Sequence, residues 1–318
     1  MKLNKPTFLI SILIACLVLA LTGCKGKEND KAGNLTALDQ SFVDSLGREV
    51  KISNPERIVV LTGSFADVLC LAGGKEKIVG AAEDTFRDFD LNLDSSVKDT
   101  GTVKEPSLET IVSLEPDLII ASSNTESQLE LKDTFEQMKI PVAYFQVSTF
   151  NEYLNMLDIL TDITGHKDNY RKYGKDVEKE INNAKKLIDE TKPKVLYIRI
   201  SSSGAKVKNS TNSVLGEMLK DLDTQNIADN NMNLLENLSM EQIALDEPDY
   251  IFIVYQSANP KDAEDIYKNN FESNKLWQGL DAVKNKRVYI MDSSLYNLKP
   301  NDKWGQAYLN LAQILYKH

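Results

Sequence analysis

Apolar and polar positions along the chain form two alternating kinds of segment. Short apolar runs rich in β-branched residues recur from residue 57 onward, and between them apolar residues return every three or four positions, as on one face of a helix. Strands that alternate with helices form parallel sheets, so the pattern predicts an α/β fold with two Rossmann-like lobes. The predicted strands are 57–62, 77–82, 117–122 and 141–147 in the first lobe, and 194–200, 226–228, 250–256 and 287–292 in the second.

A longer helical pattern separates the two series. In residues 167–192 apolar residues return at three- or four-residue intervals among charged ones, and Pro193 follows directly. This pattern predicts one long amphipathic backbone helix, ended by proline, between a lobe of residues 41–166 and a lobe of residues 193–318. A single helical connection limits how far two lobes can swing apart.

An internal repeat supports the two-lobe interpretation. The segment 107–121 (SLETIVSLEPDLIIA) matches the segment 239–253 (SMEQIALDEPDYIFI) at seven of fifteen positions. In each copy we expect a short helix to pack its apolar face, after which Glu-Pro-Asp ends the helix and begins an apolar strand. Each lobe should therefore contain the same supersecondary unit at the same place.

The amino-terminal pattern differs from the rest. Lys2 and Lys5 precede an apolar run of about 14 residues that ends at Leu-Thr-Gly-Cys, with the cysteine at position 24. The run is shorter than the roughly 20 residues of a membrane-spanning helix, so it indicates a signal peptide of residues 1–23 and a lipid-carrying Cys24. An uncleaved anchor helix is the alternative, and both place the following chain outside the cytoplasm. Residues 24–40 are polar and aperiodic, which is typical of a flexible tether.

Composition narrows the class of protein. The net charge is -10 at pH 7, from 37 basic and 47 acidic residues, and loss of Lys2 and Lys5 with the leader makes it -12. This acidic balance argues against nucleic acid as a partner. With Cys16 removed and Cys24 acylated, Cys70 is the only thiol left, so stability has to come from packing and not from an intramolecular disulfide.

Two carboxylates occupy corresponding positions in the two lobes. Asp67 and Glu217 both lie early in the helix that follows the first strand of their lobe. A helix dipole favours carboxylates in the first turn by about 0.3–1 kcal/mol, which explains both acids without a function.

Four segments give the sequence a resemblance to a known family. They are 42–61 (FVDSLGREVKISNPERIVVL), 276–292 (LWQGLDAVKNKRVYIMD) and the two copies of the repeat. On these segments the chain resembles the substrate-binding lipoproteins of ABC importers for ferric siderophores, haem and corrinoids. The resemblance covers nearly all of the chain after the leader.

The resemblance implies an extracytoplasmic, membrane-anchored binding protein. Its two lobes would hold a ferric siderophore, or alternatively a corrinoid or haem, at their interface and deliver it to a dimeric permease with its ATPase. It also implies that Asp67 and Glu217 dock onto arginines of that permease. Asp67 departs from the glutamate that the family often has there and is one methylene shorter.

Ligands of parallel-sheet lobes bind beyond the carboxyl ends of the strands. Arg87 and Arg199 are candidates for contacting an anionic group, because guanidinium pairs with carboxylate or phosphate oxygens at two points. The alternatives are solvation for Arg87 and a salt bridge within the lobe for Arg199. Aromatic residues at these positions suit a flat or apolar ligand, although each of them alone is more often part of the core, so we expect about half of them to touch ligand. The complete candidate set is Ser64, Phe65, Phe86, Arg87, Ser122, Arg199, Tyr255, Tyr296 and Trp304.

Catalytic and metal-binding patterns do not occur in the sequence. The two histidines, His166 and His318, lie away from the predicted ligand site, so neither a bare-metal site nor histidine-ligated haem is expected. Tyr255 or Tyr296 is the candidate axial ligand for a haem. Without a G-x-S-x-G, H-E-x-x-H or P-loop motif, we expect a binding protein with no catalytic residue and no intrinsic cofactor. An extracytoplasmic enzyme or an adhesin on the same fold is the distant alternative.

Overall fold

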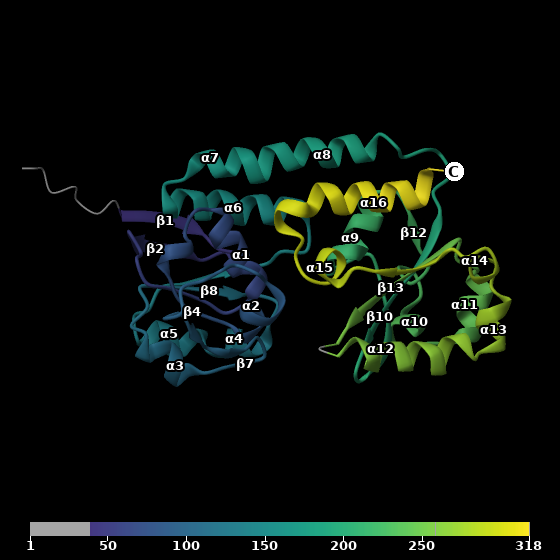
Figure 1. Ribbon diagram of the computed structural model, residues 1–318, viewed down its shortest axis with the longest axis horizontal. Helices are drawn as coiled ribbons and strands as arrows, with labels where there is room; N and C mark the ends of the chain where they lie inside the picture. Colours follow the sequence, from purple (N-terminus) through teal and green to yellow (C-terminus); the bar gives the residue numbers. More distant parts are fainter. Residues whose placement is uncertain (1–38, 258, 318) are drawn as a thin grey trace, which may run out of the picture. The chain divides into compact units, whose positions relative to one another are not determined.

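The computed structural model describes residues 39–257 and 259–317, which belong to one compact unit of residues 37–318. Within this unit the chain forms two α/β lobes (Figure 1). The predicted fold class is confirmed, and all eight predicted strands are present. The predicted signal peptide, Cys24 and nearly all of the predicted tether lie outside the described residues.

The amino-terminal lobe contains a five-stranded parallel sheet of order β5-β4-β3-β8-β9. Three of its strands are buried along their whole length, which explains their continuous apolar runs. One face packs against α1 (Gly63–Leu71) and α6 (Phe150–Thr164), and the other against α3 (Leu108–Ser113) and α5 (Lys132–Gln137). The strands are β3 (Ile58–Val60), β4 (Ile78–Ala81), β5 (Lys98–Asp99), β8 (Leu118–Ser122) and β9 (Val142–Phe145).

The carboxy-terminal lobe repeats this strand order. Its parallel strands run β12-β10-β13-β14, which corresponds to β4-β3-β8-β9 in the first lobe. It differs by β11 (Gly204–Lys208), which the apolar pattern did not predict and which forms an antiparallel hairpin with β10. The parallel strands are β10 (Lys194–Ser201), β12 (Gln225–Asn226), β13 (Tyr250–Gln256) and β14 (Val288–Met291).

Helices cover both faces of the second sheet as well. Helices α9 (Val214–Asp221) and α16 (Trp304–Tyr316) cover one face, and α11 (Met240–Asp246), α12 (Pro260–Tyr267) and α13 (Lys275–Gly279) cover the other. The remaining elements are short: β1 (Asp39–Val43), β2 (Glu49–Ser53), η1 (Lys75–Lys77), α2 (Glu83–Asp88), β6 (Gly101–Thr102), β7 (Glu105–Pro106), α4 (Glu126–Glu130), α10 (Met232–Glu236), η3 (Lys268–Glu272), α14 (Asp281–Lys284), α15 (Ser293–Tyr296) and η4 (Asn301–Lys303). Strand β1 begins at Asp39, so the last two residues of the predicted tether belong to the sheet hairpin β1-β2.

The repeated segment has the same structure in both lobes. Ser107 caps α3 by accepting a hydrogen bond from the backbone of Thr110, and Ser239 caps α11 in the same way. The helices bury Ile111 and Ile243, which are both fully inaccessible to solvent.

The turn that follows each helix is also shared. Glu115 and Glu247 have positive φ angles of 47° and 44°, which let the chain reverse before the strand. The carboxylates of Asp117 and Asp249 then accept the backbone N–H of Arg57 at 2.9 Å and of Lys194 at 2.7 Å. Each aspartate therefore fixes the start of the first strand of its lobe.

The connecting helix is shorter and less regular than the pattern predicted. It comprises α7 (Lys167–Tyr170), a π-helical turn (Arg171–Lys175) and α8 (Asp176–Lys185). The Tyr153 hydroxyl donates to the Tyr173 carbonyl at 2.9 Å, which satisfies a carbonyl of the π turn. The helix ends before Pro193 because the backbone after Lys185 turns through bonds to carbonyls three residues earlier.

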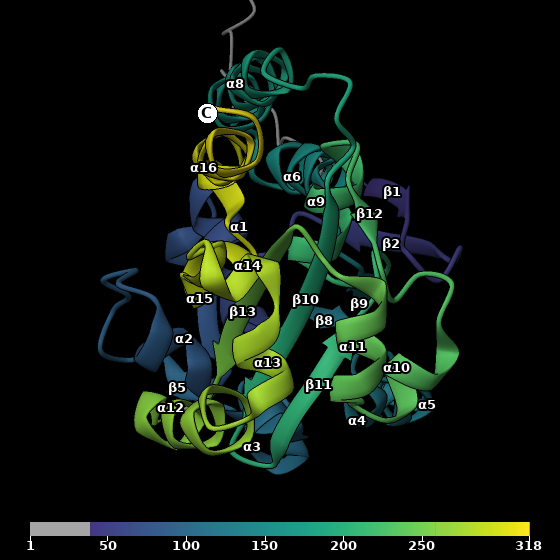
Figure 2. The same ribbon diagram turned by 90° about the vertical axis from the view of Figure 1, so that its right-hand side faces the viewer.

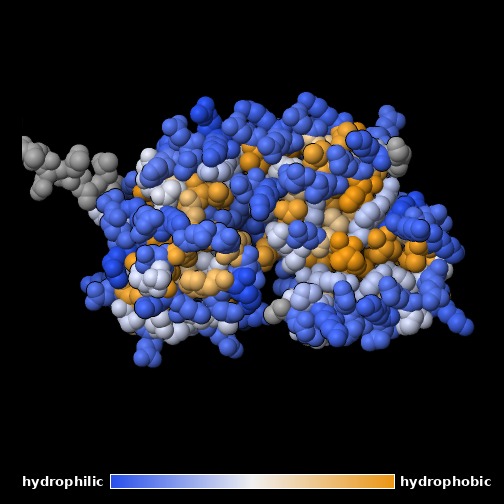
Figure 3. Space-filling view, in the orientation of Figure 1, coloured by the Kyte–Doolittle hydropathy of each residue, from blue (hydrophilic) through white to orange (hydrophobic). Residues whose placement is uncertain are grey.

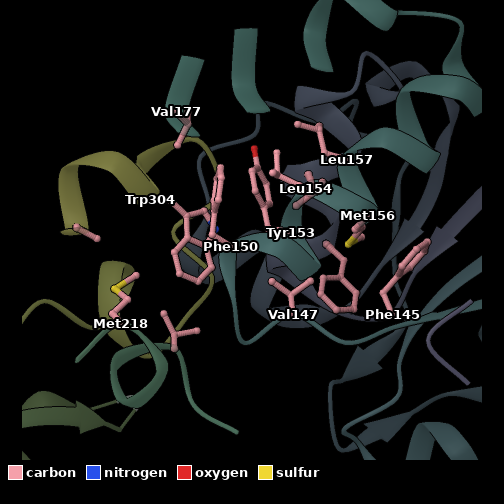
Figure 4. Close-up of a cluster of buried hydrophobic side chains, with 14 of the residues drawn as sticks. Phe145, Val147, Phe150, Tyr153, Leu154, Met156, Leu157, Val177, Met218 and Trp304 are labelled. Atoms are coloured by element: carbon pink, nitrogen blue, oxygen red, sulfur yellow. The ribbon is translucent and has the colours of Figure 1, made fainter. Parts of the chain in front are cut away.

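The two lobes share one hydrophobic core beside this helix. Val177 of α8 packs into a cluster with Phe150 of α6 and Met218 of α9 (Figure 4). The rings of Phe150 and Trp304 meet edge to face with centroids 6.0 Å apart. Helix α16 packs along α8, and Figures 1 and 2 both show it directly beneath that helix. A shared core of this kind resists separation of the lobes.

Candidate ligand-binding site

The mouth of each lobe is defined here as the segments that follow the carboxyl ends of its parallel strands. In the space-filling view the lobes meet over their upper parts and are separated by a notch below (Figure 3). The amino-terminal mouth faces a carboxy-terminal segment, because Asn301 donates from Nδ2 to the Ser64 carbonyl at 2.9 Å and to Asp67 Oδ2 at 2.7 Å. Asn301 is fully buried, so this contact joins the lobes away from water.

Equivalent aspartates hold the start of helix α1 in one lobe and the loop before helix α9 in the other. Asp84 Oδ1 accepts from the Gly63 backbone at 2.9 Å, and Asp229 Oδ1 accepts from the Ser210 backbone at 2.8 Å. Asp84 is buried whereas Asp229 is exposed. Burial raises the pKa of Asp84 to about 6, because a buried carboxyl group loses hydration of its charged form.

Arg87 and Phe86 lie on the exposed surface of α2. The Arg87 guanidinium contacts Glu83 at 2.7 Å and Asp88 at 2.8 Å, so its charge is already neutralised within the lobe. Phe86 is 47% exposed and borders a hollow of about 330 Å³, which is lined by Glu83, Phe86, Arg87, Val97 and Asp99. These two residues can reach a ligand only along the outer rim of the mouth.

Arg199 has a different environment. It is partly buried near the carboxyl end of β10, and its guanidinium donates to the Tyr197 hydroxyl at 3.3 Å. Among the described residues no carboxylate lies within 4.0 Å of it, so the alternative of an internal salt bridge is not realised. A partly buried guanidinium without a counter-ion is available to an anionic ligand.

Three of the aromatic candidates are buried side chains that pack in the core. Phe65 packs edge to face on Phe145, and Trp304 is completely buried against Phe150. Tyr296 is buried and donates its hydroxyl to the Ala307 carbonyl at 3.0 Å. Tyr255 remains partly exposed at the end of β13.

The two serine candidates have structural contacts. Ser64 is buried and engages Asn301 through its carbonyl, as described above. Ser122 is buried at the end of β8, where its hydroxyl accepts from the Asn124 backbone at 3.2 Å. Both therefore help to shape the amino-terminal mouth, Ser64 through its backbone carbonyl and Ser122 through its hydroxyl.

Asp67 and Glu217, the two corresponding carboxylates, have different contacts. Asp67 is bound by Asn301, and burial raises its pKa. Glu217 accepts from the Asn212 backbone at 3.3 Å and borders an open groove of about 400 Å³. That groove runs along α6, α8, α9 and α16, and its lining residues are Thr149, Phe150, Asn151, Glu178, Ile181, Asn182, Lys185, Glu217, Lys220, Asp221 and Tyr308.

Two residues near Arg199 were not found from the sequence. Lys208 lies on β11, whose hairpin the apolar pattern did not predict, and Lys299 lies between α15 and η4 in a segment without periodicity.

A larger hollow of about 670 Å³ lies at the opposite ends of the strands, near Asp117 and Pro141, and is therefore away from the mouth. Over the described ranges no group of three or more His, Cys, Asp or Glu side chains is placed to hold a metal ion. The same residues contain no helix with the length and apolarity to cross a bilayer.

Two matched parallel sheets and a joining helix define a two-lobed α/β protein. The chain belongs to the periplasmic binding protein family, whose model matches residues 58–295. It is 29% identical to the Fe(3+)-citrate-binding protein YfmC of Bacillus subtilis (strain 168), over 91% of this chain and 90% of that protein. It is 27% identical to the iron(3+)-hydroxamate-binding protein YxeB of the same organism, over 94% and 93%.

Solved structures show the same fold. The petrobactin-binding protein YclQ from Bacillus subtilis superposes with a TM-score of 0.67 at 20% identity, covering 88% of this chain and 98% of that one. Staphylococcus aureus SirA complexed with staphyloferrin B gives 0.64 at 23% identity, covering 87% and 97%. The family and these relatives are binding proteins, which confirms the expectation of a binding protein and not an enzyme.

Proposed function

We propose that the protein is the substrate-binding component of an ABC importer and captures an iron(III) chelate, a ferric siderophore in the first instance, between its lobes. The chain would deliver the chelate to a dimeric permease with its ATPase. Relatives named for ferric citrate and ferric hydroxamate, aligned over about nine-tenths of both chains, support this ligand class. Other relatives are named as substrate-binding or siderophore-binding lipoproteins, which supports membrane anchoring through a lipid on Cys24.

The observation that carries the proposal is the position of Arg199. It lies near the end of a central parallel strand, where ligands of such sheets bind, and it has no carboxylate partner in the described chain. Its closest polar contact is the neutral hydroxyl of Tyr197. A guanidinium left in this state suits an anionic group that arrives from solution.

Equilibrium dialysis of the purified protein tests the proposal. Ferric citrate, a ferric hydroxamate, a ferric catecholate, haem and cobalamin would each be titrated, with bound metal measured by mass spectrometry. We expect saturable binding of one chelate per protein at submicromolar concentration for an iron(III) chelate. Binding of none of the three iron chelates would contradict the ligand class.

Asp67 and Glu217 are proposed to dock onto the permease. Glu217 borders an open groove, where a permease arginine can reach it. Asp67 also positions Asn301, so removal of its carboxylate disturbs the lobe contact as well as docking. We therefore expect Glu217→Ala to lower uptake in membranes containing the permease while ligand affinity stays unchanged. The exposed Lys284→Gln variant serves as a control, and weaker ligand binding by Glu217→Ala would refute separate docking and capture surfaces.

Haem is less well supported than a chelate. Tyr296 donates its hydroxyl inside the core and cannot bind iron in this arrangement. Burial raises the pKa of Tyr255 to about 12, which disfavours the phenolate that binds haem iron. The haem arm of the dialysis experiment tests this alternative directly.

A further inference from the structure

The β10-β11 hairpin places like charges on one face. Arg199 lies directly opposite Lys206, and Tyr197 lies opposite Lys208. Because side chains alternate along a strand, these four side chains share one face of the hairpin. Like charges opposite each other in an antiparallel pair destabilise a sheet.

Lys299 adds a cation from the segment that follows β14 and α15, two residues before Asn301, which contacts the Ser64 carbonyl of the amino-terminal mouth. It is partly buried, and burial together with the charge of Arg199 lowers its pKa to about 8, whereas Glu152 of α6 acts in the opposite direction. The pKa of Lys208 is also lowered, by burial and by the charges of Arg199 and Lys206. The charged groups that act on Lys299 are thus Arg199 from β10 and Glu152 from the other lobe.

None of these cations forms an ion pair in the described chain, although the charge of Glu152 acts on Lys299 from a longer distance. No carboxylate oxygen lies within 4.0 Å of Arg199, Lys206, Lys208 or Lys299 in residues 39–257 and 259–317. The chain has a net charge of -10, and many of its other exposed lysines do form ion pairs. Three partly buried cations, Arg199 near the carboxyl end of β10, Lys208 on the neighbouring strand and Lys299, therefore have no ion-pair partner in an acidic protein.

We propose that Arg199, Lys208 and Lys299 form a subsite for the anionic groups of the ligand, and that the protein selects a chelate of net negative charge with uncoordinated carboxylates. The proposal rests on the proposed function and narrows its ligand class. Arg199 would supply two-point pairing with one carboxylate, and the lysines would supply point charges. A neutral or cationic ferric hydroxamate offers none of these groups.

A bound anion would also hold a proton on Lys299. Above pH 8 the free protein has this lysine partly deprotonated, and an adjacent carboxylate favours its charged form. Ligand binding at pH 8.5 should therefore take up protons, up to about one per protein from this lysine. If the chelate bound without contacting Lys299, its binding would not be accompanied by this proton uptake.

Isothermal titration calorimetry tests the subsite. Ferric citrate, a ferric catecholate and a ferric hydroxamate would be titrated at pH 7.0 and 8.5, each in two buffers of different ionisation enthalpy. The variants are Lys299→Gln and Lys208→Gln, with Lys284→Gln on exposed α14 as the matched control. Proton uptake is compared between proteins with the same ligand, so ionisation of the ligand itself cancels.

The outcomes separate the subsite from the proposed function. We expect the carboxylate chelate to bind at least tenfold more weakly to Lys299→Gln, with the proton uptake at pH 8.5 lost, and Lys284→Gln to behave as the unmodified protein. A stronger response to the catecholate would keep the anionic subsite and reassign its ligand group to catecholate. Equal binding by Lys299→Gln, or preference of the unmodified protein for the hydroxamate, would overturn the subsite while chelate binding itself stood.

Discussion

Arg87 in the amino-terminal lobe lies between two carboxylates, whereas Arg199 in the carboxy-terminal lobe has none and faces Lys206 across a hairpin. The frames around them are nevertheless matched. Both lobes have the same order of parallel strands, and both begin the first strand on an aspartate of the repeated segment. The lobes therefore share their strands and turns and differ in side chains such as Arg87 and Arg199, which the fold itself does not require.

Under the proposed function, this difference assigns recognition of the ligand's anionic groups to the carboxy-terminal lobe. Asp117 and Asp249 accept hydrogen bonds from backbone N–H groups that would otherwise be unpaired. Both lobes need such an acceptor at the start of the strand. The charges of Arg199 and Lys299 satisfy no such requirement and oppose each other. We infer that the amino-terminal lobe mainly supplies a wall and that the carboxy-terminal lobe supplies the charge that binds the ligand.

The largest expected effect tests whether the frames are equivalent. Ile111→Ala and Ile243→Ala each remove a fully buried side chain from the repeated helix, and each should cost about 2–5 kcal/mol of unfolding free energy. Urea unfolding followed by circular dichroism measures both. Leu245→Ala, at a side chain that is 78% exposed, is the control and should change little. A loss below about 1 kcal/mol for only one isoleucine would break the equivalence.

The next effect tests the difference between the mouths. Arg199→Gln should weaken binding of an iron(III) chelate by roughly 10- to 100-fold, because a charge-assisted hydrogen bond contributes about 1.5–3 kcal/mol. Arg87→Gln should change affinity less than about threefold, since its charge is already paired and exposed. Equilibrium dialysis measures both, and equal losses for the two variants would remove the proposed asymmetry.

A third test uses the two aspartates that hold the loops. The raised pKa of Asp84 means that the native state keeps a proton which the unfolded chain releases between about pH 4 and 6. This group therefore makes the protein less stable as pH rises through that window, and the penalty is complete above pH 6. Asp84→Asn can still accept from Gly63 and should gain about 1–3 kcal/mol at pH 7.5 relative to pH 4.5.

Asp229→Asn is the matched control for this experiment, because it changes an exposed carboxylate with the same backbone role. Unfolding at the two pH values should respond less to Asp229→Asn than to Asp84→Asn. The reverse order would show that burial does not distinguish the two aspartates.

The smallest effect concerns the shared turn. Glu115→Gly and Glu247→Gly place glycine at a positive φ, and each should stabilise by about 0.5–1 kcal/mol or leave stability unchanged. Glu109→Gly and Glu241→Gly, at exposed helical positions, should each cost about 1 kcal/mol. Thermal unfolding detects the opposite signs, and destabilisation by glycine at the turns would contradict the shared geometry.

Much of the fold could be predicted from the apolar pattern, since parallel strands that are buried on both faces consist of continuous apolar runs. The apolar pattern did not predict β11, because Gly204–Lys208 contains two lysines and only Val207 in it is buried deeply. The connecting helix was overextended for a related reason. Leu187 and Ile188 keep the helical spacing, although the backbone there has already begun to turn.

The candidate site was predicted less completely than the fold. Arg199 could be proposed because its strand was evident and the face on which it lies could be assigned. The burial of Phe65, Tyr296 and Trp304 could not be predicted, since position after a strand does not distinguish a side chain that lines a mouth from one that enters the core. Lys299 and Asn301 could not be found, because their roles depend on contacts between segments far apart in sequence.

A crystal structure of the protein with a bound carboxylate-bearing iron(III) chelate tests the central claim most directly. The account predicts the chelate between the lobes, with its anionic groups on Arg199, Lys208 and Lys299 and its other side against the amino-terminal mouth. A chelate bound between the lobes with no contact to these cations, or bound outside the mouths, would contradict it.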